Sequence, residues 1–354
     1  MEDSTRLKDE CYFGACNSYD GFKNYFDIIF NRRIFDRVYV IKGGPGTGKS
    51  SFMKKMLSEL SGEVRKEIIL CSSDPKSLDG IIVESEKGRV AFLDGTSPHV
   101  TEAQIPGAKD EIIDLGKNWD TRYLRAQKDK ICKLSEEKSA AYKTAYYYLA
   151  LAGKCDEICN EVIGSIYDVK ESKTEALRLI NEISLCREGK SDTRLTSAFC
   201  KHGRYSIDTL EKKAKRFIKI SGQKEAKGLF LKDLKEALLV LCANHTLSPS
   251  PLSPLCPEAI FLPKEEILIG EALGDEVIEC DKFLKKDAVL ANEKTKVARG
   301  LWDYSLNEAK RWFGIASDIH FRLEEIYSSA MDFSKNDKIF SKKLSEAKSI
   351  LKLS

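Results

Sequence analysis

The sequence predicts an α/β fold that occurs twice in tandem, each half being a mostly parallel sheet domain followed by a long helical segment. Strand-like apolar runs alternate with helical patterns in residues 1–119, and a glycine-rich stretch near residue 45 joins a strand to a helix. Such alternation is typical of a parallel sheet covered on both faces. The same order of elements returns after a shift of about 180 residues, which indicates two similar domains packed as a pseudo-dimer.

The first elements expected are a short strand at 12–16, an amphipathic helix over 22–30 and a buried strand at 37–41. The last of these reads RVYVI, and β-branched and aromatic residues favour strands. A helix is expected over 51–60. Its apolar residues recur at helical spacing: Phe52, Met53, Met56, Leu57 and Leu60.

Between this strand and helix, residues 43–50 read GGPGTGKS, which has the Walker A spacing G-x-x-x-x-G-K-[ST]. Glycines let backbone amides converge on a polyphosphate, and the helix N-terminus adds a positive dipole. We therefore expect Lys49 to contact the β- and γ-phosphates of a nucleotide and the Ser50 hydroxyl to bind Mg²⁺. The alternative is a glycine turn without a ligand. The residues expected to bind the nucleotide are Gly43, Gly44, Pro45, Gly46, Thr47, Gly48, Lys49, Ser50 and Ser51.

Three further strands are expected in the first half, at 67–71, 81–83 and 90–93. The last reads VAFL and is followed at once by Asp94. Four apolar residues ending in an acid are typical of a Walker B strand, whose carboxylate binds Mg²⁺ beside the Ser50 hydroxyl. We expect this role for Asp94, the alternative being an aspartate that caps a turn.

Hydrolysis requires a group that orients the attacking water, and Gly95 occupies the position after Asp94 where many P-loop ATPases have a glutamate. The remaining candidates lie on the loops after two strands: Asp74, Asp79, His99 and Glu102. Ligands of open α/β sheets bind at the carboxyl ends of the strands. We therefore expect Asp74 and His99 to act with Lys49 as catalytic residues. Their alternative roles are a turn cap and a loop hydrogen bond.

From residue 106 the pattern becomes helical, with a short helix expected over 109–117 and two long helices over 120–152 and 155–186, separated at Gly153. Helices of this length extend roughly 45 Å and suit an antiparallel hairpin that projects from the sheet domain. A compact helical layer folded against the sheet is the alternative. The resulting domain limits are 1–119 for the phosphate-binding domain, 120–190 for the hairpin, 191–275 for the second sheet domain and 276–354 for the final helical segment.

In the second half, the stretch that corresponds to the Walker loop reads SGQKEAKG over 221–228. Lys227 keeps the position of Lys49, but Ser221 and Ala226 replace the two consensus glycines, Gly43 and Gly48, and the serine hydroxyl is lost. Gly270 stands where the second half needs the equivalent of the Asp94 carboxylate. We therefore expect the second half to bind nucleotide poorly or not at all.

Composition excludes several classes of protein. The 354 residues carry 58 Lys+Arg and 55 Asp+Glu, a formal charge of +3, so no general attraction to nucleic acid or to an anionic membrane is expected. The N-terminus, MEDSTRLKDE, lacks the apolar run of a secretory signal, and no stretch approaches the roughly 18 apolar residues of a membrane span. Eleven scattered cysteines without a C-x-x-C pair indicate reduced thiols. We expect a cytoplasmic protein.

Four segments carry a resemblance to a known family: IKGGPGTGKSSFMKK, CSSDPKSLDG, AFLDGTSPH and PGAKDEIIDLGKNWD. With them the chain resembles an uncharacterised bacterial family of tandem P-loop proteins, labelled as ATPases or ATP-binding proteins. The resemblance implies ATP as the ligand and a second P-loop domain, but no substrate. The chain departs from that pattern in its second loop, which argues against ATP hydrolysis at two sites.

Three functions are compatible with this pattern. The first is an ATPase switch, in which Mg²⁺-ATP orders loops 72–80 and 94–106, repositions the helical hairpin and is slowly hydrolysed. The second is a kinase that phosphorylates a small molecule, and the third is an ATP-binding scaffold without turnover. A protein or small-molecule partner is expected in each case, and the sequence does not identify it.

Overall fold

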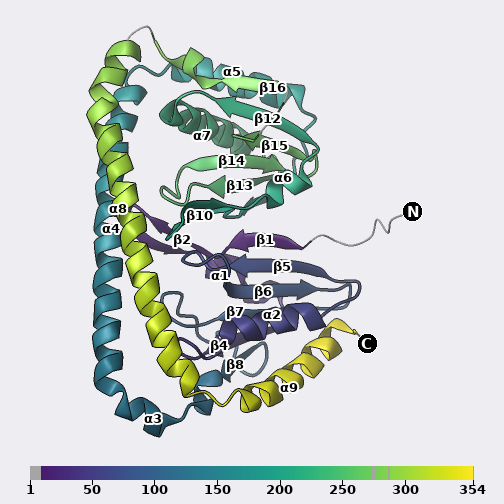
Figure 1. The fold of residues 1–354 in the computed structure, drawn as a ribbon. Coiled ribbons are helices and arrows are strands. Elements are labelled where there is room, and N and C mark those ends of the chain that lie inside the picture. Colours follow the sequence, from purple (N-terminus) through teal and green to yellow (C-terminus); the bar gives the residue numbers. More distant parts are fainter. Residues whose placement is uncertain (1–8, 273, 275, 286–287, 354) are drawn as a thin grey trace.

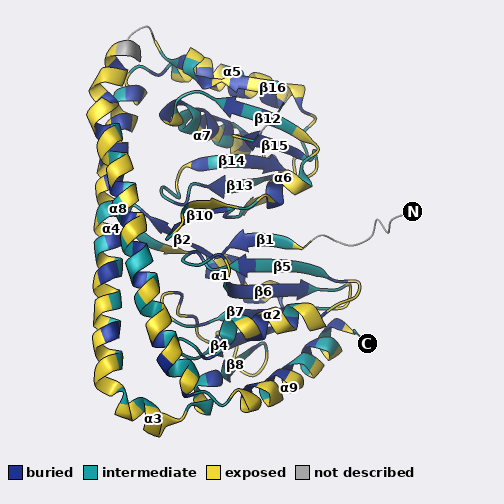
Figure 2. Cartoon of the chain, viewed as in Figure 1, coloured by how far each residue is buried: buried dark blue, intermediate teal, exposed yellow. Residues whose placement is uncertain are grey.

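The computed structural model describes residues 9–272, 274, 276–285 and 288–353 (Figure 1). Most of the charged N-terminal stretch used above to argue against a secretory signal lies in residues 1–8, outside these ranges. Two six-stranded sheets are stacked beside a pair of long helices that run past both of them. Buried residues concentrate in the sheets and on the inward sides of the helices (Figure 2).

The first sheet has the strand order β1-β5-β6-β7-β4-β8. β6 is antiparallel to both of its neighbours, and the other three pairings are parallel. Only short turns join β6 to β5 and β7, so no crossover helix can return the chain in the parallel direction. The strands are β1 (Glu10–Phe13), β4 (Arg37–Lys42), β5 (Arg65–Leu70), β6 (Leu78–Glu84), β7 (Arg89–Asp94) and β8 (Asp110–Asp114).

The second sheet, β16-β12-β15-β14-β13-β9, repeats this arrangement strand for strand, including the antiparallel position of β14. β12 thus corresponds to β4, and β15 to β7. The repetition confirms the prediction of two similar α/β halves. The strands are β9 (Ser191–Thr193), β12 (Arg216–Ser221), β13 (His245–Pro249), β14 (Pro257–Leu262), β15 (Ile267–Gly270) and β16 (Glu276–Glu279).

Two short ribbons lie where the halves meet, β2 (Ala15–Ser18) with β3 (Gly21–Asn24) and β10 (Ser197–Cys200) with β11 (Gly203–Ser206). The short helices α1 (Phe26–Ile29), η1 (Arg32–Ile34) and α6 (Thr209–Lys213) follow them. One apolar cluster contains α1, β4 and β7 residues of the first half together with α6, β14 and β15 residues of the second. The two sheets therefore share part of their core.

The helical segments are exchanged between the halves (Figure 1). After the first sheet, α4 runs along the molecule and leads into α5, which packs on α7 of the second half. After the second sheet, α8 runs back along α4 and leads into α9, which packs on α2 of the first half. The helices are α2 (Lys49–Glu59), α3 (Thr121–Ala126), α4 (Lys128–Gly164), α5 (Val169–Glu182), α7 (Lys224–Val240), α8 (Ala288–Ser329) and α9 (Phe333–Leu351).

The expected helical hairpin of 120–152 with 155–186 is wrong. α4 continues through Gly153, because this glycine marks a close approach and not a break: a Cβ there would lie 2.8 Å from Cβ of Tyr19. The antiparallel partner of α4 is α8. Within the described residues, no helix combines the length and apolar character needed to cross a lipid bilayer.

Two smaller expectations also fail. The helix predicted over 109–117 is the edge strand β8 followed by the 3-10 turn η2 (Leu115–Asn118), and another such turn, η3 (Cys280–Phe283), follows β16 in the second half. The helix predicted over 22–30 begins as strand β3 and is helical only in α1. In both places the elements have four or five residues, too few to show a helical or strand period.

Candidate functional site

Residues 43–48, the glycine loop, leave the carboxyl end of β4 and enter α2. Three of the glycines have positive φ, +149° at Gly43, +68° at Gly46 and +84° at Gly48, a conformation that other residues rarely adopt. Lys49 begins α2, and its Nζ donates to the carbonyl oxygens of Gly43 (2.9 Å) and Gly44 (3.0 Å). The lysine amine is therefore turned back over the loop, at the N-terminus of an eleven-residue helix.

Asp94 ends β7, the strand next to β4, and lies opposite Ile41 in the parallel register. Its Oδ2 is 3.6 Å from Nζ of Lys49, and both side chains are 13% exposed. Its Oδ1 accepts hydrogen bonds from the N–H and the hydroxyl of Thr96, at 2.8 and 2.5 Å. One carboxylate oxygen is thus held by the loop after β7, and the other faces the glycine loop.

Ser50 lies in the first turn of α2, and its Oγ accepts a hydrogen bond from the N–H of Leu78 at 3.0 Å. Leu78 is the first residue of β6, and Asp79 follows it. The contact therefore joins the start of α2 to the strand that carries Asp79.

Asp79 and His99 lie next to Asp94. Nε2 of His99 is 3.5 Å from Oδ2 of Asp79, and one ligand atom from each of the three residues lies within 4.8 Å of the others. Asp79 and His99 are each 5% exposed. The His99 ring stacks on Phe26, with centroids 4.6 Å apart, which fixes the plane of the imidazole.

Burial, and after it the negative charge of Asp94, raises the pKa of Asp79 to about 8. Burial lowers the pKa of His99. Near neutral pH these shifts favour a protonated carboxyl beside a neutral imidazole. Buried groups with shifted pKa values beside a cleft are typical of functional sites.

Asp74, the other predicted catalytic acid, makes different contacts. Its Oδ1 accepts from the N–H of Lys76 at 3.2 Å, which is the turn-capping role named as its alternative. Its Oδ2 pairs at 3.1 Å with Lys201, which also donates to Ser317 of α8. Asp74 therefore connects the loop after β5 to the second half, and its catalytic role stays a prediction. Glu102 is exposed and pairs with Lys42 at 2.6 Å.

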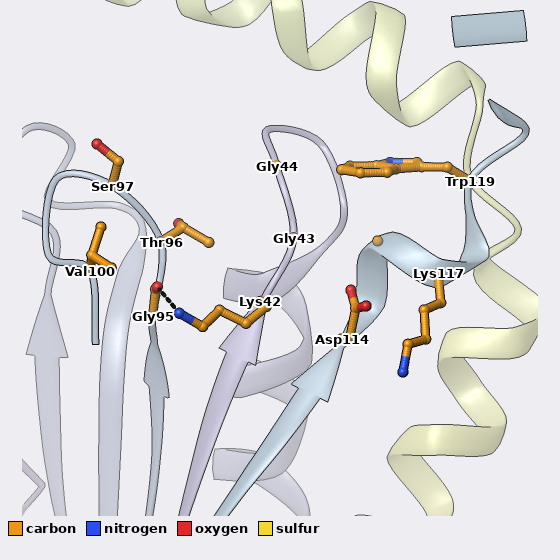
Figure 3. A pocket seen from close by; sticks show the side chains of 11 residues that line it. Lys42, Gly43, Gly44, Gly95, Thr96, Ser97, Val100, Asp114, Lys117 and Trp119 are labelled. Carbon is orange, nitrogen blue, oxygen red and sulfur yellow. Dashed lines mark hydrogen bonds between the residues drawn. The ribbon is translucent and has the colours of Figure 1, made fainter. Parts of the chain in front are cut away.

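A pocket of about 650 Å³ lies beside the glycine loop (Figure 3). The loop after β7 borders one side, and the end of β8 with Lys117 and Trp119 borders the other. Lys42, at the end of β4, donates to the carbonyl oxygen of Gly95 at 2.9 Å. Trp119 is the aromatic side chain in its wall, with a Cβ position on Gly44 lying 3.2 Å from the indole. Pockets of this volume accept small molecules the size of a nucleoside.

Helices that follow the second sheet hold the outer side of the glycine loop. Gly46 lies against α8: a Cβ there would be 2.6 Å from the carbonyl oxygen of Glu324 and 2.9 Å from the nitrogen of Ser328. From α9, Asn336 donates to the carbonyl oxygen of Thr47 at 3.0 Å. These contacts could not be predicted from the sequence, because no local pattern in either segment depends on the other.

The Glu324 carboxyl of α8 lies close to the glycine loop and to Lys49. A hydrogen bond from His320 is the first cause that lowers the pKa of Glu324, and the charge of Lys49 and the N–H of Gly46 lower it as well. An acidic side chain of α8 therefore already lies within the field of the lysine and the loop backbone.

The corresponding part of the second half contains carboxylates of its own. The N–H of Gln223 donates to Oδ1 of Asp281 at 2.8 Å, and the Ser221 hydroxyl donates to Oε2 of Glu279 at 2.7 Å. Lys227, the counterpart of Lys49, pairs with Glu271. A phosphate approaching the start of α7 would meet negative charge, which gives a physical reason for the expected loss of nucleotide binding.

Comparisons of the chain with protein-family models, with curated proteins and with solved structures found no match.

Proposed function

We propose that the chain is an ATP-binding P-loop protein. The first half binds Mg²⁺-ATP and hydrolyses it slowly, and this drives a conformational switch in which α8 and α9 move. One observation carries the proposal. The glycine loop, with Lys49 folded over it and Asp94 beside it, is in backbone contact with α8.

The phosphates are proposed to lie against the glycine loop. Lys49 exchanges its hydrogen bonds to the Gly43 and Gly44 carbonyls for charge-assisted bonds to the β- and γ-phosphates. The backbone N–H groups of residues 43–51 other than Pro45, which has none, and the N-terminus of α2 supply the remaining donors.

Ser50 and Asp94 fit a magnesium ion by their donor chemistry. A hydroxyl and a carboxylate are hard oxygen ligands of the kind Mg²⁺ prefers. Oδ2 of Asp94 faces the loop, and Oγ of Ser50 keeps one lone pair beyond its bond to Leu78. Mg²⁺ bound there supplies positive charge to the phosphates, and the protein residues hold it beside Lys49.

The nucleoside is proposed to lie in the pocket beside the loop. Trp119 offers an aromatic face next to Gly44, and stacking on such a face favours a base. The same pocket is large enough for a small phosphate acceptor. A small-molecule kinase is therefore the second candidate function, favoured also by Gly95 in place of a glutamate after Asp94.

The switch follows from charge and contact. An incoming γ-phosphate has the same sign as the Glu324 carboxylate, which lies close enough to Lys49 and Gly46 for both to lower its pKa. Repulsion and competition for the same donors then move this part of α8 away from the loop. Because α8 packs along α4 and continues into α9, the displacement reaches both halves.

Measuring ATP binding and ADP production on the full chain tests the proposal. Binding with basal turnover supports the switch, and turnover that appears only with a metabolite extract supports the kinase. Binding without turnover leaves a scaffold, the third function compatible with the sequence. A chain that does not bind ATP in the presence of Mg²⁺ overturns all three.

A further inference from the structure

Three potential metal ligands from separate segments meet beside the glycine loop: Asp79 from β6, Asp94 from the end of β7 and His99 from the loop after it. Their ligand atoms lie within 4.8 Å of one another. The sheet explains the meeting of the two carboxylates. Gly80 pairs with Leu93 in the antiparallel register of β6 and β7, so Asp79 and Asp94 are neighbours at one end of the ladder.

A second observation indicates a missing ligand. Oδ2 of Asp79 is buried and has no hydrogen-bond partner among the residues that the structure describes. Nε2 of His99 is 3.5 Å away, at the outer limit of a hydrogen bond, and the Cys71 thiol is the other polar group against this carboxyl. A buried carboxyl oxygen without a partner is costly, and a bound cation that displaces the carboxyl proton would satisfy it.

We propose that Asp79, Asp94 and His99 bind a divalent transition metal ion, with Mn²⁺ as the best match. Mg²⁺ prefers oxygen ligands alone, whereas an imidazole nitrogen favours first-row transition metals. A structural Zn²⁺ site uses four protein ligands, and three ligands leave coordination positions open for water or phosphate oxygen. The site deepens the proposed function, because it shares Asp94 with the proposed nucleotide site, but it requires no nucleotide.

Lys49 gives this proposal a distinctive consequence. Its ammonium is 3.6 Å from Asp94, and its charge acts on both Asp79 and His99. The lysine therefore competes electrostatically with a metal ion when no phosphate is present. Removing that charge strengthens metal binding by about tenfold or more, although the same change is expected to abolish ATP binding.

The experiment titrates Mn²⁺ into the full, nucleotide-free chain and follows the free ion by electron paramagnetic resonance. We expect one bound Mn²⁺ per chain that excess Mg²⁺ does not displace, with a ¹⁴N coupling from the imidazole in the pulsed spectrum. His99→Gln removes the coupling, and His99→Gln and Asp79→Asn each weaken binding by about tenfold or more. Glu102→Gln, an exposed carboxylate on the same loop as His99, is the matched control and leaves binding unchanged.

The proposal is overturned if Mn²⁺ binds stoichiometrically without ¹⁴N coupling, or if Mg²⁺ at a similar concentration displaces the bound Mn²⁺. It is also overturned if the wild-type chain does not bind Mn²⁺. Circular dichroism of each variant separates loss of a ligand from loss of fold. ATP binding is measured in parallel with Mg²⁺. Stronger Mn²⁺ binding in Lys49→Ala supports the metal site even if the wild-type chain fails to bind ATP, and unchanged or weaker binding contradicts it, so the two proposals fail separately.

Discussion

Replacing Gly46 by alanine tests whether α8 senses the glycine loop. The substitution forces an alanine to φ +68°, which costs about 1–2 kcal/mol for an L-residue in the left-handed region. It also places a Cβ 2.6 Å from the backbone carbonyl of Glu324, a contact that only a shift of backbone can relieve. Overpacking of this kind costs about 1–3 kcal/mol. Gly107→Ala is the control, since Gly107 has φ +76° and no described atom lies within 4 Å of its Cβ position.

Native-state hydrogen exchange of residues 318–329, the last turns of α8, measures the effect locally. In Gly46→Ala we expect the free energy of opening of these turns to fall by about 1–3 kcal/mol, so that exchange is roughly 5- to 150-fold faster. In Gly107→Ala exchange in α8 stays as in the wild type. Equal exchange in the two variants would refute the contact between loop and helix as the basis of the switch.

Two further predictions concern stability. The pKa of Asp79 is about 8 in the folded chain and close to 4 in the unfolded chain. The protonated carboxyl therefore contributes its full stabilisation to the fold below pH 4, and this contribution is lost as the pH rises toward 8. In urea unfolding, the free energy of unfolding of Asp79→Asn should therefore equal that of the wild type near pH 4 and exceed it by on the order of 3 kcal/mol at pH 8. A difference in unfolding free energy that does not change with pH would contradict the burial of this carboxyl. Gly153→Ala should destabilise the chain by about 1–3 kcal/mol in the same assay, because its Cβ meets Tyr19. Gly164→Ala is the control in the same helix, because no described atom lies within 4 Å of the Cβ position on Gly164. It should leave the free energy of unfolding unchanged or raise it by up to about 1 kcal/mol. A change of the same sign in both variants would mean that α4 does not pack on Tyr19.

The repeated α/β architecture could be predicted because its signals are local. The strand before Gly43, the helix after Ser50 and the acid after β7 each follow from the period or composition of a few residues. The exchange of helices between halves could not be predicted, since the apolar stripe of α4 is the same whichever helix covers it. Gly153 shows the ambiguity: a glycine in a helical pattern marks either an end or a close approach, and only the position of Tyr19 decides.

The candidate site could be predicted in part for the same reason. Asp94 and Lys49 come together through neighbouring parallel strands, an arrangement that the strand and loop patterns indicated. Asp79 is only one of several candidate acids in the sequence, because β6 is irregular at this end: Leu78 pairs with Leu70 and Gly80 with Ile69, so simple alternation does not assign Asp79 to a face. Glu324 lies in the last third of the chain, and no sequence pattern connects it to the loop.

Titration of ATP into the Lys49→Ala and Lys227→Ala variants, compared with wild type, tests most directly the claim that the first half alone forms a nucleotide pocket. Lys49 faces the glycine loop and Asp94, whereas Lys227 is paired with Glu271. We predict that Lys49→Ala abolishes ATP binding and that Lys227→Ala changes the Kd little. Equal losses in the two variants would contradict the claim.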